Sequence, residues 1–126
     1  MKATELRIGN LVYDKWANVA KVESIGMHEN VRISTKDYEF ESNKIYDLFS
    51  INLTEEWLLK FGFKLDMVNF NWNAAIGENE IGDFKLALRY SERIGWFFQS
   101  KCTVIKYVHQ LQNLYFALTC EELEVK

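Results

Sequence analysis

Residues 106–119, which read Lys-Tyr-Val-His-Gln-Leu-Gln-Asn-Leu-Tyr-Phe-Ala-Leu-Thr, decide the fold of this chain. Their large apolar residues recur at helical spacing and cover an arc of about 120°, the width of a stripe that faces a core. These residues are Tyr107, Val108, Leu111, Leu114, Tyr115 and Leu118. The spacing therefore predicts a long amphipathic helix that packs on a sheet.

The opposite face of this helix carries no formal charge. A solvated helix face usually carries Lys and Glu, which are good helix formers and are easily hydrated. Here it carries His109, Gln110, Gln112, Asn113 and Phe116. We expect such a face to be covered and its amides to be hydrogen-bonded. His109, Gln112, Asn113 and Phe116 are thus a candidate interface, covered either by the N-terminal part of the chain or by a second subunit.

The composition excludes several classes of protein. The chain has 126 residues, enough for one domain or two very small ones, and 48% of them are hydrophobic, so a core can form. The net charge of -3 does not favour nucleic acid or an anionic membrane as the main partner. The sequence shows no apolar run of membrane-spanning length and no signal-peptide pattern. We expect a cytoplasmic location and no membrane partner.

Residue types that could carry chemistry are scattered. Cys102 and Cys120 lack metal-type spacing, and we expect both to be reduced thiols in the core. His109 is a lone histidine among amides, which indicates a structural residue. The acidic loop at 77–83 does not have the spacing of a calcium-binding loop. No acid, base and nucleophile can be combined, so the sequence predicts no enzyme, no cofactor and no metal site.

The first 53 residues form a β-rich region. Short runs of β-forming residues are separated by turn signals at Gly9-Asn10 and at 28–30, with further runs at 31–34, 38–41 and 45–53. About five short strands in this length must remove their open edges, and closing into a small SH3-like β-barrel does so. We therefore predict such a barrel for residues 1–53.

Residues 54–126 alternate between helix and strand. Thr54 is suited to cap the start of a helix, acids fill its first turn, and Gly62 is suited to end it. Antiparallel strands are predicted within 67–74, 84–90, 94–99 and 103–106, followed by the long helix and an alternating tail at 121–125 that could add an edge strand. The predicted fold class is α+β, with a barrel at 1–53 and a helix–sheet–helix region at 54–126. Since no linker separates the two regions, we expect one cooperative unit.

Two stretches resemble the signatures of a family of small uncharacterised Bacteroidetes proteins. They are Leu-Thr-Glu-Glu-Trp-Leu-Leu-Lys-Phe-Gly-Phe at 53–63 and Tyr-Val-His-Gln-Leu-Gln-Asn-Leu-Tyr-Phe-Ala-Leu-Thr at 107–119, and residues 6–10 are similar to the family's N-terminal segment. Genes of this family often occur in prophages or mobile elements, and the family has no assigned activity. Cys120 stands where the family pattern usually has Gly, so a left-handed helix stop there would be strained.

Charge is unevenly distributed along the chain. Residues 84–106 hold five basic residues and one acid, whereas residues 54–83 hold two basic residues and six acids. If Phe84, Leu86, Leu88 and Tyr90 face the core, Lys85 and Arg89 point outward together. Together with Arg93 they form a candidate basic strip, which is either an ordinary solvated face or a contact for nucleic acid or an acidic protein.

The resulting functional expectation is a non-enzymatic protein-interaction module, acting as an accessory protein of a mobile element or prophage. Its partner is an unknown protein or a second copy of the chain. The alternative is a nucleic-acid-binding protein that uses Lys85, Arg89 and Arg93.

Overall fold

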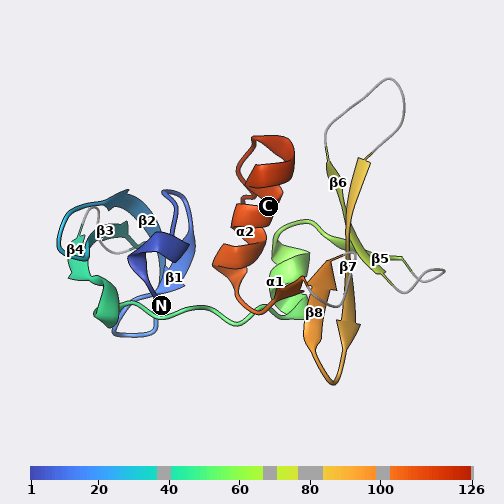
Figure 1. The fold of residues 1–126 in the computed structure, drawn as a ribbon, viewed down its shortest axis with the longest axis horizontal. Coiled ribbons are helices and arrows are strands. Elements are labelled where there is room, and N and C mark those ends of the chain that lie inside the picture. The colour runs from blue at the N-terminus through green and yellow to red at the C-terminus, as the bar shows by residue number, and fades with distance from the viewer. Residues whose placement is uncertain (37–40, 67–70, 77–83, 99–102, 126) are drawn as a thin grey trace. The chain divides into compact units, whose positions relative to one another are not determined.

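The computed structural model describes residues 1–36, 41–66, 71–76, 84–98 and 103–125, and for residues 41, 66, 71–76 and 84–87 it describes the backbone alone. These residues form an α+β fold with two antiparallel sheets and two α-helices (Figure 1). The chain divides into two compact units. The first unit comprises Met1–Asn52 and Tyr107–Asn113, and the second comprises Leu53–Lys106 and Leu114–Lys126. The predicted boundary at 53/54 had not assigned residues 107–113 to the N-terminal region.

The first unit is built on a four-stranded sheet of order β1-β2-β3-β4, and every neighbouring pair is antiparallel. Its elements are η1 (Ala3–Glu5), β1 (Leu11–Tyr13), β2 (Val19–Ile25), β3 (Asn30–Ser34), β4 (Glu41–Lys44) and η2 (Ile45–Asp47). The predicted turn between β2 and β3 is present. His28 and Glu29 both have positive φ there, the conformation that a tight two-residue hairpin turn requires.

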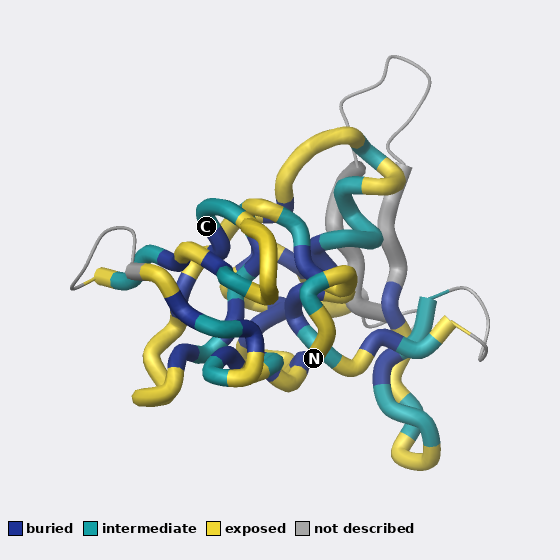
Figure 2. The backbone as a smooth tube through the Cα atoms, turned by 60° about the vertical axis from the view of Figure 1, so that its left-hand side comes forward, coloured by how far each residue is buried: buried dark blue, intermediate teal, exposed yellow. Residues whose placement is uncertain are grey.

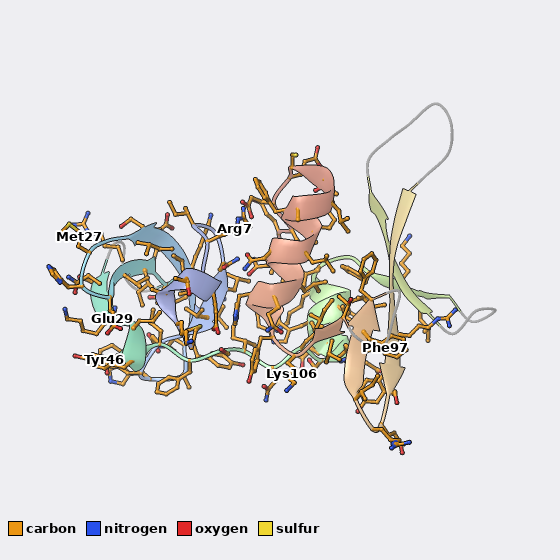
Figure 3. All side chains as sticks on the ribbon, viewed as in Figure 1. Arg7, Met27, Glu29, Tyr46, Phe97 and Lys106 are labelled. Carbon is orange, nitrogen blue, oxygen red and sulfur yellow. The ribbon has the colours of Figure 1, made fainter. Side chains whose placement is uncertain are left out.

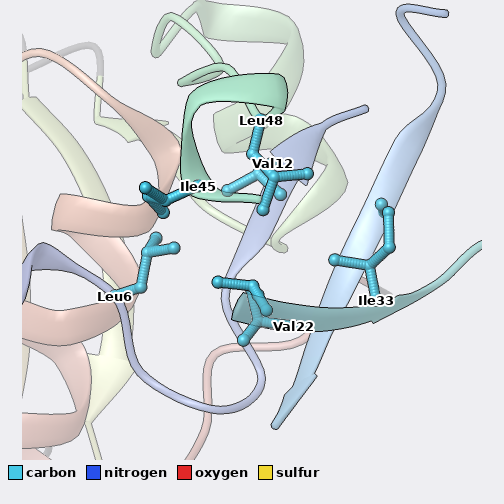
Figure 4. Packing of buried hydrophobic residues seen from close by; sticks show 8 residues of the cluster. Leu6, Val12, Val22, Ile33, Ile45 and Leu48 are labelled. Carbon is cyan, nitrogen blue, oxygen red and sulfur yellow. The ribbon is translucent and has the colours of Figure 1, made fainter. Parts of the chain in front are cut away.

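One face of this sheet supplies the core of the first unit. Val12, Val22, Val31 and Ile33 are fully buried, and they alternate with partly or fully exposed residues along their strands. Leu6, Ala20, Ile45 and Leu48 complete the cluster, and Figure 4 shows how these side chains meet. The alternation that indicated strands in the sequence is thus the alternation between this core and the outer surface.

The predicted SH3-like barrel is wrong, because the sheet of the first unit does not close. Residues 45–47 form a 3-10 helix where a further strand was expected. The chain returns to the free edge of β1 through a single bridge. In it, the N–H groups of Tyr13 and Phe49 each donate to the other residue's carbonyl oxygen at 2.8 Å. One bridge pairs only part of an edge, so β1 needs another partner.

The second unit opens with helix α1 (Glu55–Lys60), whose predicted ends are confirmed. Thr54 Oγ1 accepts a hydrogen bond from the N–H of Trp57 at 3.4 Å, so Thr54 is the N-cap. At the other end Gly62 has φ +86, its N–H donates to Leu59 O, and the N–H of Phe63 donates to Leu58 O. This pair of bonds is a Schellman motif, which favours Gly in the left-handed position.

A five-stranded antiparallel sheet follows, with order β5-β6-β7-β8-β9. Its strands are β5 (Lys64–Asp66), β6 (Asn71–Ile76), β7 (Phe84–Ser91), β8 (Gly95–Phe98) and β9 (Val104–Ile105). The turn between β7 and β8 is exposed (Figure 2). On β7, Leu88 is buried as predicted, but Tyr90 is exposed. The tail at 121–125 forms no strand in the described structure, and the buried Leu123 is its main anchor.

Helix α2 (Val108–Thr119) is the predicted long helix, and its residues 108–113 belong to the first unit. The predicted apolar stripe is buried only over its first half. Val108 and Leu111 are fully buried, whereas Leu118 is 47% exposed. The helix ends at Cys120, which has φ +60 and whose N–H donates to Phe116 O at 2.8 Å. Cys120 is a free, exposed thiol, so the prediction that it lies in the core is wrong.

The left-handed conformation of Cys120 yields a stability prediction. A residue with a Cβ in this conformation costs roughly 1–2 kcal/mol, and glycine removes that cost while adding entropy to the unfolded chain. We expect Cys120→Gly to raise the free energy of unfolding by up to about 1 kcal/mol, measured by urea denaturation. Cys120→Ser removes the thiol and keeps the Cβ, so it should leave stability unchanged. A Gly variant no more stable than the Ser variant would show that the helix end carries no such strain.

Candidate functional site

The uncharged face of α2 contacts the N-terminal segment of the first unit through Gln112. Its side chain is buried, and its carboxamide bonds two backbone groups that flank Asn10. Oε1 accepts from the N–H of Leu11 at 2.8 Å, and Nε2 donates to the carbonyl oxygen of Gly9 at 3.2 Å. The carboxamide thus occupies the free edge of the chain at β1, where a neighbouring strand would otherwise place a peptide group.

Asn113 extends this contact toward the N-terminus. Its Oδ1 accepts from Asn10 Nδ2 at 2.9 Å and from Arg7 Nη1 at 3.3 Å, and its Nδ2 donates to the carbonyl oxygen of Glu5 at 2.9 Å. Asn10 is fully buried and also accepts from the N–H of Arg7 at 2.7 Å. Figure 3 shows Arg7 in the N-terminal segment. The prediction that the amides of Gln112 and Asn113 make hydrogen bonds is confirmed, and the first unit supplies their partners.

His109 lies in the same unit and is buried, with its ring stacked on Tyr107 at 5.6 Å between ring centroids. Neither ring nitrogen has a hydrogen-bond partner among the described residues. Burial lowers the pKa of His109, and the N-terminal amine lowers it further, while the carboxylate of Glu5 acts in the opposite direction. The folded protein therefore favours the neutral imidazole more strongly than the unfolded chain does. Phe116, the fourth residue of the candidate interface, is half-buried and belongs to the second unit.

The outer face of the N-terminal sheet carries apolar residues that the sequence did not single out. Val19 lies opposite Tyr13 in the pairing of β1 and β2, and Phe49 lies opposite Tyr13 on its other side. Residues opposite one another point to the same face, so these three side chains form a row. Val19 is 42% exposed and Phe49 is 55% exposed. We call this row, together with Trp16, the outer apolar face.

Trp16 lies in the turn between β1 and β2, which the pair of Tyr13 and Val19 closes. Asp14 is buried and organises the turn, since its Oδ1 accepts from the N–H groups of Trp16 and Asn18, each at 2.9 Å. Asp side chains stabilise turns in this way. The indole of Trp16 is 55% exposed, and Lys15 Nζ lies 4.5 Å from its ring centroid. Only strand pairing brings Phe49 to Tyr13, so no local pattern in the sequence could have revealed this face.

The predicted basic strip is only partly described. Arg89 on β7 and Arg93 in the following turn are both exposed, and Arg89 lies opposite Phe97 of β8. The side chain of Lys85 and the acidic loop at 77–83 lie outside the described part of the structure. Across the described residues, no group of His, Cys, Asp and Glu side chains could hold a metal ion. No helix within the described ranges has the length and apolar character to span a membrane.

Comparisons with protein-family models, curated proteins and solved structures find no match for this chain. The function must therefore be inferred from the residues themselves.

The burial of His109 predicts how stability depends on pH. Its pKa is lowered in the folded state, so below about pH 6.5 the unfolded chain takes up a proton that the folded chain does not. The free energy of unfolding should therefore fall as the pH drops below this value. We expect His109→Phe, which removes the titrating ring, to flatten the dependence between about pH 7 and pH 5, measured by urea denaturation.

His28 provides the matched control, because it is exposed in a turn. His28→Gln should leave the pH dependence of the wild type intact. Equal slopes for wild type and His109→Phe would mean that His109 is protonated in the folded protein as readily as in the unfolded chain.

Proposed function

We propose that this protein is a non-enzymatic protein-interaction module that binds a partner protein through the outer apolar face of its N-terminal unit. The observation that carries the proposal is the exposure of Val19 and Phe49 on either side of Tyr13, together with the exposed Trp16 in the adjoining turn. Large exposed apolar groups that gather on one surface favour an interaction site, whereas single ones are ordinary. Trp and Tyr are also enriched among the residues that dominate protein interfaces.

The backbone beneath this face is held in place before any partner arrives. Asp14 fixes the turn that carries Trp16. The two bonds between Tyr13 and Phe49 fix the position of Phe49. A surface that needs little ordering on binding retains more of its contact energy as affinity. A fixed backbone at this face favours a binding site over a chance group of exposed apolar side chains.

The partner is a second protein or a second copy of this chain. The resemblance of residues 53–63 and 107–119 to proteins encoded in prophages and mobile elements extends the proposal to an accessory role in such an element. Whether the partner is a second protein or a second copy of the chain, the proposal requires that the outer apolar face be the contact surface.

The alternative function is nucleic-acid binding by the hairpin of β7 and β8. The exposure of Arg89 and Arg93 on one hairpin favours it. The exposed Glu92 between them and the net charge of -3 weigh against it, because phosphate binding depends on a local excess of positive charge.

Capture from a lysate of the source organism tests the proposal, with bound proteins quantified by mass spectrometry. The double variant Trp16→Ser, Phe49→Ser should lose a protein, or a second copy of the chain, that the wild type retains. Met27→Ser is the matched control, since Met27 is exposed at the turn between β2 and β3 (Figure 3). All three proteins should have free energies of unfolding within about 0.5 kcal/mol of one another, because the altered side chains are exposed.

Nuclease treatment separates the two functions. Capture that persists after nuclease treatment and depends on Trp16 and Phe49 supports protein binding. Capture that nuclease abolishes, that falls steeply with salt, and that is lost in Arg89→Glu, Arg93→Glu instead supports nucleic-acid binding. Capture unaffected by the Trp16 and Phe49 changes would contradict the proposed surface.

A further inference from the structure

The second unit contains a pocket of about 320 Å³ between the start of α1 and the hairpin of β7 and β8. Leu53, Thr54, Glu55, Tyr90 and Trp96 line it. Small-molecule sites usually enclose about 300–1,000 Å³, so this pocket has the size for a small group such as one side chain. Neither the outer apolar face nor the amide contacts of α2 involve these residues.

Two aromatic rings form one wall of the pocket. Tyr90 and Trp96 lie opposite each other on β7 and β8, and their ring centroids are 5.0 Å apart. Trp96 is buried, whereas Tyr90 is 59% exposed although its strand neighbour Leu88 is fully buried. The faces of such rings attract cations through their electron-rich π systems.

An acidic residue, Glu55, also lines the pocket. Glu55 is the first residue of α1 and is exposed, and among the described residues no basic side chain forms an ion pair with it. The positive end of a helix disfavours a cation, but α1 has only six residues and two acids in its first turn. The polar rim of the pocket is therefore negative.

Elsewhere on α1, a carboxylate and an aromatic ring together contact a cation of the chain itself. Lys60 Nζ lies 3.6 Å from Glu56 Oε1 and 4.6 Å from the ring centroid of Trp57. One carboxylate and one aromatic ring of this helix thus hold a cation of the chain itself. Glu55 and the pair of Tyr90 and Trp96 repeat that combination around an open space.

We propose that this pocket binds the guanidinium group of an arginine side chain on a partner protein. The planar group stacks on Tyr90 and Trp96 and pairs with Glu55, while its aliphatic stem contacts Leu53. Arginine fits better than lysine, because a flat delocalised cation can stack on a ring and donate to a carboxylate at once. The inference rests on the proposed function only in that a protein carries the arginine, and it uses a different surface.

Titration of the intact protein with the amide of Gly-Arg-Gly tests this directly, observed by ¹⁵N NMR at the indole N–H of Trp96 and the backbone amides of Glu55 and Tyr90. We expect saturable shifts at these groups. The amide of Gly-citrulline-Gly has a side chain of nearly the same shape that lacks the guanidinium charge, and it should produce no shifts. The lysine tripeptide should bind more weakly. Equal shifts with the citrulline and arginine peptides, or no shifts with either, would overturn the proposal.

Two neighbouring acids provide a matched pair of variants. Glu55→Gln should weaken binding of the arginine peptide by about two- to fivefold, the range expected of an exposed ion pair. Glu56→Gln should leave it unchanged, since Glu56 does not line the pocket. Tyr90→Leu should abolish binding while the rest of the spectrum shows a folded protein. Equal effects of Glu55→Gln and Glu56→Gln would point to general attraction by an acidic surface and overturn the assignment.

This titration contains no partner protein, so its result does not depend on the outer apolar face. If the peptide does not bind while capture through Trp16 and Phe49 is intact, the arginine-binding proposal is wrong and the proposed function stands. If capture is lost while the peptide binds normally, the proposed function is wrong and the arginine-binding proposal stands.

Discussion

The N-terminal unit depends on one carboxamide, that of Gln112. β1 is paired on one side by β2, and on its other edge the described residues form a single bridge, between Tyr13 and Phe49. Next to that bridge, Gln112 accepts from Leu11 N–H and donates to Gly9 C=O, the two groups that a neighbouring strand would bond. An open edge would leave these partly buried backbone groups unpaired, which costs at most about 1–3 kcal/mol each. The side chain of Gln112 on α2 therefore pairs part of the strand edge that closure into a barrel would have paired.

This constraint explains the composition of the helix. A face that must bond a strand edge and the N-terminal segment needs groups that both donate and accept, as the amides of Gln112 and Asn113 do. Lys or Glu could supply only one of these roles and would have to bury a charge one turn from the buried His109. The unusual absence of charge thus reflects pairing within the first unit, and the surface left for a partner is the outer apolar face, where Trp16 and Phe49 are exposed.

Local signals in the sequence predicted local structure well. Thr54 and Gly62 set the ends of α1 because their capping bonds span only a few residues. The sequence also predicted that the amides of α2 would be bonded, but it could not identify their partners, since Leu11 and Gln112 are far apart in the chain. The barrel was predicted from strand count alone, whereas closure depends on what pairs with β1. The exposure of Tyr90 and the row that contains Phe49 likewise depend on the register between strands, which no single segment encodes.

Hydrogen exchange at the amide of Leu11 tests the central role of Gln112 most directly. Gln112→Met keeps the size and helix propensity of the side chain but leaves Leu11 N–H and Gly9 C=O without their partner. The account predicts that exchange at Leu11 accelerates more than exchange at Ile33, which lies in the middle of the same sheet, and that the free energy of unfolding falls by about 2–4 kcal/mol. Unchanged protection of Leu11 in the stably folded variant would contradict the account.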